Sequence, residues 1–180
     1  MKEENFYFPI KVWLNKAKNC SYVRIRKNIW GKQPDVIGIK FSKTPENLLK
    51  AFLYIIEVKV IDSLSSIYEV IGEIELKTAL FINNSSMFYA LYPYIAIFEK
   101  ILSHDIQLYC KIRKIGLIKL KYKNKVLIEL SSYPEPIILK NFISIESLTK
   151  EMNLNSDESR LLEEAINAIG WWKLKEFISR

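Results

Sequence analysis

Three residues in the first third of the chain have the types and spacing of a metal-dependent hydrolytic site: Asp35, Glu57 and Lys59. Asp35 follows a proline at the head of one apolar run, and Glu57 and Lys59 lie at the end of a second run. The two acids are 22 positions apart, from 35 to 57. Carboxylates supply the hard oxygen ligands that Mg²⁺ prefers, beside water and phosphate oxygens. A nearby ammonium can orient a water molecule and stabilise charge that develops on a phosphate. The trio predicts metal-assisted hydrolysis, provided that folding brings the two runs together.

Two predicted strands, Asp35–Phe41 and Ala51–Val60, position these residues. The second run is rich in β-branched and aromatic residues, with no glycine or proline inside it, which is typical of a buried strand. Side chains alternate between the faces of a strand, so Glu57 and Lys59 share a face. Burying such charges is costly unless they are paired or used. The simpler alternative is a surface Glu57–Lys59 ion pair, with Asp35 an ordinary turn residue.

Pro34-Asp35 followed by Glu57-Val58-Lys59 resembles the PD-(D/E)XK nuclease superfamily, which includes restriction endonucleases, archaeal Holliday junction resolvases and related repair nucleases. The resemblance covers roughly residues 3–130. It implies a restriction endonuclease-like α/β core, with a four-stranded mixed sheet flanked by helices. To this core the pattern of the chain adds a β-hairpin and a small C-terminal helical region. The resemblance also implies that Asp35, Glu57 and the Val58 carbonyl hold Mg²⁺, for which Mn²⁺ can substitute, while Lys59 positions the attacking water.

Two further acids match the same resemblance. Glu4, or its neighbour Glu3, stands where many members carry an acid on the first helix, and we expect Glu4 to line the catalytic site; the alternative is an acid that the helix dipole favours. Glu73 follows Gly72 where relatives often have glutamine, and we expect it near DNA. Glu73 also belongs to a line of charges at four-residue spacing, which is typical of a solvated helix face.

Basic residues in two predicted strands are expected to contact DNA phosphates: Arg24, Arg26, Lys119, Lys121 and Lys123. The lysines alternate with apolar residues in the first strand of a predicted hairpin, Leu117–Tyr122 and Val126–Leu130. A row of lysines on one strand face suits a phosphate backbone and reads no base sequence. It suits equally well the protection of an exposed edge strand against aggregation.

The remaining elements follow from periodicity and from turn residues. We expect a helix over residues 3–19 and three antiparallel strands, of which the first is Ser21–Ile29. A helix capped at Asp62-Ser63 should run to about Phe81 and lead to a parallel strand, Met87–Tyr92, that Pro93 ends. The last predicted elements are helical: Tyr94–Ile115 with Gly116 at its C-terminal cap, Ser144–Met152, Ser156–Ile169 with Ser156-Asp157 as its cap, and Trp171–Ser179.

Composition limits the function further. A chain of 180 residues that is 49% hydrophobic suits one nuclease-like domain over residues 1–130 with a helical extension over 131–180. Its net charge of +7 suits nucleic acid or another anionic partner. Residues 1–130 carry +9 and residues 131–180 carry −2. Cys20 and Cys110 are too few for a four-cysteine metal site, and the sequence fits buried thiols or, less simply, a disulfide. His104 reads as a capping or surface residue.

These patterns lead to one main functional hypothesis and one alternative. The first is a Mg²⁺-dependent DNA endonuclease or exonuclease, for which a structure-specific role in repair or recombination is one option. We expect it to be cytoplasmic, without a membrane segment, and to form a homodimer. The alternative is a catalytically inactive DNA-binding or assembly subunit that binds a partner protein through its C-terminal helices. Trp171-Trp172 could stack on bases, although packing on the core or on a second subunit suits this acidic region better.

Overall fold

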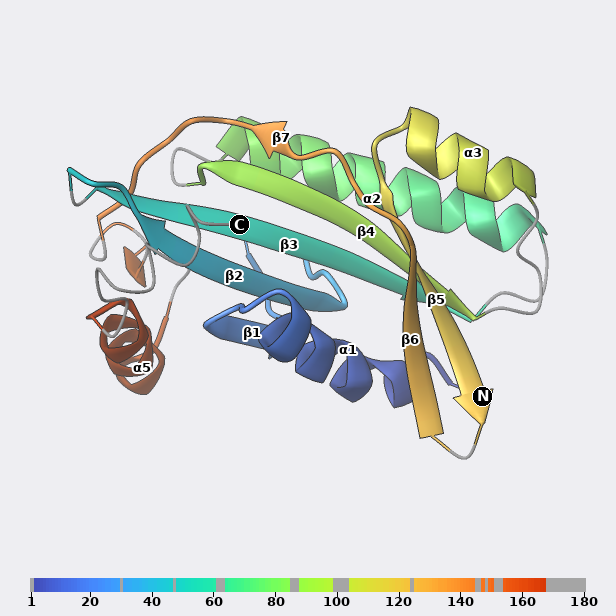
Figure 1. Cartoon of the computed structure of the whole chain (residues 1–180), viewed down its shortest axis with the longest axis horizontal. Helices are drawn as coiled ribbons and strands as arrows, with labels where there is room; N and C mark the ends of the chain where they lie inside the picture. The colour runs from blue at the N-terminus through green and yellow to red at the C-terminus, as the bar shows by residue number, and fades with distance from the viewer. Residues whose placement is uncertain are drawn as a thin grey trace.

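A computed structural model of the protein describes residues 2–29, 31–46, 48–60, 64–84, 88–98, 104–123, 125–144, 147, 149–150 and 154–167. The fold is α/β, with one mixed sheet and helices on both of its faces (Figure 1). The elements in chain order are α1 (Glu4–Ala17), β1 (Tyr22–Ile25), β2 (Val36–Lys43), β3 (Leu49–Lys59), α2 (Leu64–Asn84), β4 (Ala90–Phe98), α3 (His104–Ile112), β5 (Gly116–Lys123), β6 (Lys125–Ser132), β7 (Ile137–Ile138) and α5 (Ser156–Asn167).

Strand β3 shows why the sheet is central. Its odd-numbered residues Leu53 and Ile55 pack in the apolar layer that includes α2, whereas Tyr54, Ile56 and Val58 pack in the layer that includes α1. Both faces of the strand are therefore buried, as its almost unbroken apolar sequence predicts. The strand order is β1-β2-β3-β4-β5-β6, and β7 pairs with β4.

The predicted directions of the first four strands are confirmed. β1, β2 and β3 are antiparallel, and β3 is parallel to β4. The helix α2 makes the crossover between the two parallel strands, as such a connection requires. In the β2–β3 pair Val36 lies opposite Ile56, so Asp35 and Glu57 occupy neighbouring positions at the C-terminal end of β3. We call this edge of the sheet the rim.

The prediction that Pro93 ends the fourth strand is wrong. β4 continues through Pro93, which lies in register with Ile55, and ends at Phe98. On the other side of β4, β7 pairs only with residues 90–91 and β5 begins to pair at Tyr94. Among the described strands Pro93 thus has a paired neighbour on one side only, an edge-like setting in which a proline is tolerated.

The prediction of a helix over Tyr94–Ile115 is wrong for its first part, because Tyr94–Phe98 belongs to β4 and α3 covers only His104–Ile112. Gly116 is not the helix cap. Lys114 takes the left-handed conformation at φ 61°, and the amides of Lys114 and Ile115 bond to the carbonyls of Lys111 and Cys110. This is the Schellman pattern, made here without glycine.

The predicted hairpin extends the central sheet and is not an addition to it, because β5 pairs with β4 over residues 116–120. The first strand is shorter than predicted and ends at Ile25, after which Arg26 has φ 49°. Helix α2 runs three residues past the predicted Phe81, and its predicted cap Asp62-Ser63 lies outside the described residues, as does Trp171–Ser179.

The C-terminal segment contributes to the same apolar layer as α2. Ile143 forms an isolated bridge with Leu49 of β3, and Leu162 and Ile166 of α5 are buried in that layer. The cap of α5 is Asn155, not the predicted Ser156-Asp157: its side-chain oxygen accepts the Glu158 N–H at 2.8 Å, and its own N–H lies 3.3 Å from the Glu158 carboxylate. This reciprocal pair is a capping box.

Candidate active site

The structure brings Asp35 and Glu57 together at the rim. The Asp35 carboxylate accepts a hydrogen bond from the Val58 N–H at 2.8 Å and another from the Tyr7 hydroxyl at 2.8 Å. The first bond joins the head of β2 to the end of β3, and the second joins the rim to helix α1. Asp35 is therefore held between three elements and is not a free turn residue.

Glu57 is the buried member of this acid pair. Its side chain extends from β3 towards α2, where Oε2 lies 2.6 Å from Nζ of Lys77, whose ammonium is also 3.4 Å from the Gln33 carbonyl oxygen. The residue is 2% exposed, and Oε1 has no hydrogen-bond partner among the residues that the structure describes. A buried carboxylate oxygen without a partner is costly, so one position on Glu57 remains for a cation or a donor.

The surroundings raise the pKa of Glu57 from 4.5 to about 7. Burial is the largest cause, because it disfavours the charged form. The charges of Asp35 and Glu73 act in the same direction, whereas the hydrogen bond and the charge of Lys77 act against them. A second cation close to Glu57 would favour its charged form and lower this pKa.

Lys59 lies at the rim but does not contact Glu57. Its Nζ is 3.9 Å from the Glu3 carboxylate at the start of α1. The lysine that pairs with Glu57 is Lys77, from α2. The structure therefore brings the two predicted acids to neighbouring positions, but the amine that meets Glu57 is Lys77 and not the predicted Lys59.

The oxygen donors at the rim fit a hard cation in part. In an antiparallel pair the N–H and C=O of one residue face the same neighbouring strand, so the Val58 carbonyl faces the side from which its N–H binds Asp35. Asp35, Glu57 and this carbonyl would make an all-oxygen set, and Mg²⁺ needs only one or two carboxylates. Over the described ranges no three His, Cys, Asp or Glu side chains cluster as metal ligands.

Glu4 reaches the acid pair only indirectly. Its carboxylate lies 3.4 Å from Arg26, whose guanidinium also donates to the Tyr7 hydroxyl at 3.2 Å. Tyr7 in turn donates to Asp35. Burial, together with the bond and charge of Asp35, raises the pKa of Tyr7 to about 12, against the effect of Arg26. Tyr7 therefore remains a proton donor to Asp35 at neutral pH.

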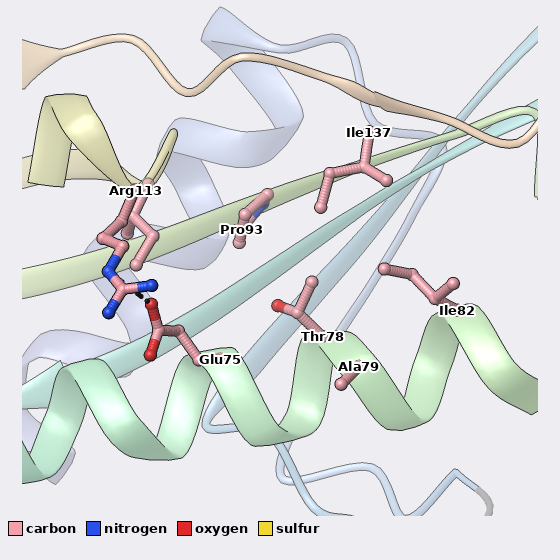
Figure 2. Close-up of a pocket in the computed structure, with 8 residues that line it drawn as sticks. Glu75, Thr78, Ala79, Ile82, Pro93, Arg113 and Ile137 are labelled. Carbon is pink, nitrogen blue, oxygen red and sulfur yellow. Dashed lines mark ion pairs between the residues drawn. The ribbon is translucent and has the colours of Figure 1, made fainter.

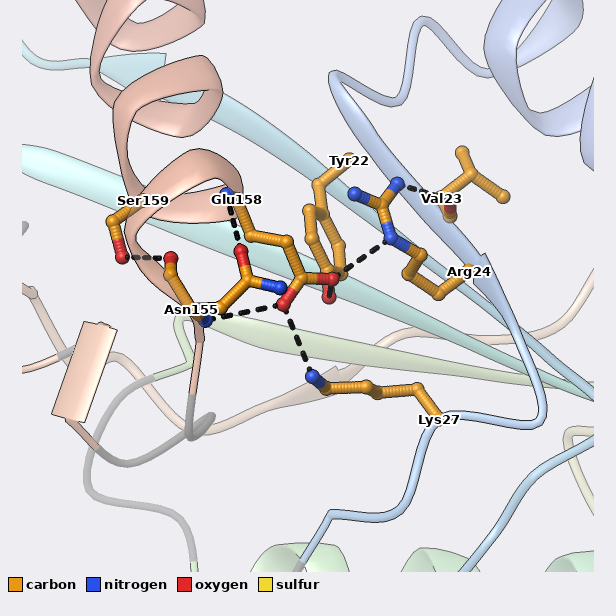
Figure 3. Close-up of polar contacts among 7 residues, drawn as sticks. All are labelled: Tyr22, Val23, Arg24, Lys27, Asn155, Glu158 and Ser159. Atoms are coloured by element: carbon orange, nitrogen blue, oxygen red, sulfur yellow. Dashed lines mark hydrogen bonds and ion pairs between the residues drawn. The ribbon is translucent and has the colours of Figure 1, made fainter.

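Arg24 is engaged by the C-terminal helix (Figure 3). Its Nε lies 2.9 Å from the Glu158 carboxylate, which also accepts from Lys27 at 3.2 Å and from the Tyr22 hydroxyl at 3.3 Å. Burial is the largest single effect and raises the pKa of Glu158, but the hydrogen bonds from Arg24, Lys27 and the Asn155 N–H, with the charge of Lys27, outweigh it and leave the pKa lowered. The charge of Arg24 is thus offset inside the molecule and is less available to a phosphate than the sequence suggests.

The lysine row of β5 continues from the rim. Lys59, Ile97 and Lys119 are in register across β3, β4 and β5, which places the Cα atoms of the two lysines about 10 Å apart. At Lys119 β5 has a paired strand on each side, so edge protection does not explain that lysine. Beyond Leu120 the described part of β5 pairs only with β6, and there edge protection remains an explanation for Lys121. The side chain of Lys123 lies outside the described part.

Glu73 is exposed on α2, one helical turn before Lys77, and its charge is felt by Glu57. A pocket of about 270 Å³ lies further along the same helix and opens between α2, β4 and β7 (Figure 2). Its lining includes Thr78, Pro93 and an ion pair between Glu75 and Arg113 at 3.4 Å. None of the predicted site residues lines it.

Sequence reasoning missed two residues that contact the acid pair, Tyr7 and Lys77. Both approach from helices, and nothing in a strand-based motif indicates which helical residue will reach it. A partial signal existed for each: Tyr7 lies one turn after Glu3, and Lys77 ends the line of charges that includes Glu73.

No protein-family model, curated protein or solved structure is significantly similar to this chain. Each helix in the part of the chain that the structure describes is too short or too polar to cross a membrane.

Proposed function

We propose that the protein is a Mg²⁺-dependent deoxyribonuclease that hydrolyses DNA phosphodiester bonds at the rim, with a PD-(D/E)XK site made by Asp35, Glu57, Val58 and Lys59. The observation that carries the proposal is the buried Glu57 Oε1, which has no described partner and stands beside a second carboxylate. Such an arrangement costs free energy in the absence of a cation and becomes favourable when one binds.

Each residue has a distinct role in this proposal. Asp35, Glu57 and the Val58 carbonyl would hold the cation, which supplies Lewis-acid stabilisation of the charge that builds up on the phosphate. Lys59 donates a hydrogen bond that orients the attacking water and stabilises the same charge. Tyr7 fixes the rotamer of Asp35 through its 2.8 Å hydrogen bond, and Lys77 offsets the charge of Glu57 on the helix side.

The surrounding charges favour a polyanionic substrate. Residues 1–130 carry a net charge of +9, and the lysines of β5 extend the positive surface from Lys59 in the direction of Lys119 and Lys121. Contacts of lysine with phosphate carry no base specificity and weaken as salt rises. We therefore expect cleavage that depends little on base sequence. Its rate should fall steeply between about 50 and about 200 mM salt, the range over which such phosphate contacts weaken.

The test is a cleavage assay on plasmid, single-stranded and four-way-junction DNA with Mg²⁺ or Mn²⁺. Asp35→Ala, Glu57→Ala and Lys59→Ala should each reduce the rate by a factor of about 10² or more. Asp105→Ala and Lys111→Ala are matched controls, because they remove the same charges from exposed positions on α3, and they should cleave like the wild type. Cleavage that survives two of the three rim substitutions would exclude this site.

A second candidate function is an inactive DNA-binding or assembly subunit with the same fold. It is favoured by one observation: both Asp35 oxygens already accept hydrogen bonds, and one Glu57 oxygen is held by Lys77, so the carboxylates are largely satisfied within the chain. Tight DNA binding by a wild-type protein that cleaves none of the three substrates with either metal would favour this candidate.

A further inference from the structure

A row of four aromatic side chains crosses the face of the sheet that carries α1. Trp13 of α1 meets Tyr94 edge to face at 5.7 Å, Tyr94 stacks with Tyr54 at 6.4 Å, and Tyr54 stacks with its strand neighbour Tyr92 at 4.8 Å and 9°. The ends of the row, Trp13 and Tyr92, are partly exposed, whereas the two central rings are buried. This aromatic row lies on the face opposite to the one from which Lys77 reaches Glu57.

Positive charge lies directly on the aromatic row. The Lys18 ammonium is 5.2 Å from the centre of the Trp13 ring, 5.9 Å from that of Tyr94 and 5.3 Å from that of Tyr133. Tyr133, from the segment after β6, is 75% exposed. No carboxylate among the described residues forms an ion pair with Lys18. In that part of the chain the charge of Lys18 is stabilised by cation–π contacts with these rings.

The ammonium of Lys40 on β2 influences the charge of Lys18. Burial lowers the pKa of Lys18 and the charge of Lys40 lowers it further. Lys40 lies opposite Phe52, which is partly buried against the same layer. Lys40 thus adds positive charge near Lys18, which suits an anionic ligand.

The combination identifies the class of ligand. At one end of the row, the exposed ring of Tyr133 and the partly exposed ring of Trp13 can meet unpaired bases, which stack on aromatic side chains whatever their sequence. The Lys18 ammonium beside both rings suits the phosphates that link the bases. In a duplex the base faces are stacked on one another and cannot reach such a row. We propose that the exposed end of the aromatic row, formed by Trp13, Tyr133 and Lys18 with Lys40 nearby, binds single-stranded DNA.

This inference rests on the proposed function only in the choice of DNA as the nucleic acid, and it names a substrate class: DNA that has an unpaired strand next to the point of cleavage. The aromatic row and the acid pair share no residue. Binding can therefore be measured with the divalent cations removed, so that loss of binding and loss of cleavage are separate results.

The experiment measures the fluorescence anisotropy of a labelled dT oligonucleotide of about 20 nucleotides, a length that exceeds common single-strand site sizes, in EDTA over a series of salt concentrations. Tyr133→Ala should weaken binding by about fivefold to a hundredfold, the loss of one stacked base. Lys18→Gln should lower the slope of log affinity against log salt by about 0.7, the loss of one phosphate contact.

Matched controls come from the other face of the sheet. Tyr68 is 67% exposed on α2 and Lys111 is exposed on α3, so Tyr68→Ala and Lys111→Gln should bind like the wild type. An unlabelled duplex of the same length should compete at least tenfold less well than the unlabelled single strand.

Several results would overturn the inference. They are a wild type that does not bind the oligonucleotide, binding that is unchanged in both Tyr133→Ala and Lys18→Gln, and a duplex that competes equally well. A fourth comes from sedimentation: if Tyr133→Ala converts a dimer into a monomer while oligonucleotide binding is retained, the row is an interface between copies of this chain.

Discussion

At the scale of single residues, Glu57 decides most of what the site can do. A carboxylate that is 2% exposed loses the hydration that stabilises its charge. The bond from Lys77 restores only part of that stabilisation, since the pKa remains near 7. The residual cost is the physical reason to expect a second cation, and it also makes the stability of the metal-free protein depend on pH.

We predict that the free energy of unfolding of the metal-free protein falls as pH rises from 4.5 to 7. In this window folded Glu57 keeps a proton that the unfolded chain has released, because its folded pKa is raised from 4.5 to about 7. Glu57→Gln has no proton to lose. Above pH 7 the free energy of unfolding of Glu57→Gln should exceed that of the wild type by up to about 3 kcal/mol. The loss of the ion pair with Lys77 reduces this gain.

Denaturant titrations in EDTA at pH 5 and pH 8 check this prediction. The stability difference between Glu57→Gln and the wild type should grow in favour of the variant at the higher pH. Asp105→Asn, an exposed acid on α3, controls for the general effect of losing a charge. A difference that is the same at both pH values would show that Glu57 ionises as readily in the folded as in the unfolded protein.

At the scale of elements, local pattern predicted the strands better than the irregular positions. Alternation and β-branched content located β2, β3 and the β5–β6 hairpin, and a helical crossover implied the parallel β3–β4 pair. The predictions at Pro93 and Gly116 were wrong because contacts with residues distant in the sequence decide the structure at both positions. The gap between β7 and β5 lets a proline stay in a strand, and the ring of Tyr94 requires a residue without Cβ at 116.

Two glycine substitutions test these element-level conclusions. A Cβ at Gly116 would collide with the Tyr94 ring and lie 2.8 Å from Cδ of Pro134, so Gly116→Ala should destabilise the protein by about 1–3 kcal/mol. A Cβ at Gly72, in the exposed face of α2, meets nothing within 4 Å, so Gly72→Ala should stabilise it by about 0.5–1 kcal/mol.

Thermal unfolding of the two variants beside the wild type measures both effects at once. The two shifts in melting temperature should have opposite signs. Shifts of the same sign would mean that the sheet can adjust around residue 116 or that α2 is not a regular helix at residue 72.

At the scale of the whole molecule, the fold gathers distant charges into two groups. One group lies along the rim and consists of the acid pair, Lys59 and Lys119. In the other group Glu158 forms ion pairs with Arg24 and Lys27, which join the acidic C-terminal part to β1 and the residues after it. The sequence motif predicted the juxtaposition of Asp35 and Glu57 because it follows from one antiparallel register. It could not predict the Arg24–Glu158 pair, which joins residues 134 positions apart.

The measurement that tests the central claim most directly is a calorimetric titration of Mn²⁺ into the wild type, Asp35→Asn and Glu57→Gln at pH 8, with Asp105→Asn as the control. We predict a saturable site in the wild type and the control, and a loss of affinity of at least about tenfold in both rim variants. A wild type that binds no Mn²⁺, or rim variants that bind it as tightly as the wild type, would contradict the account.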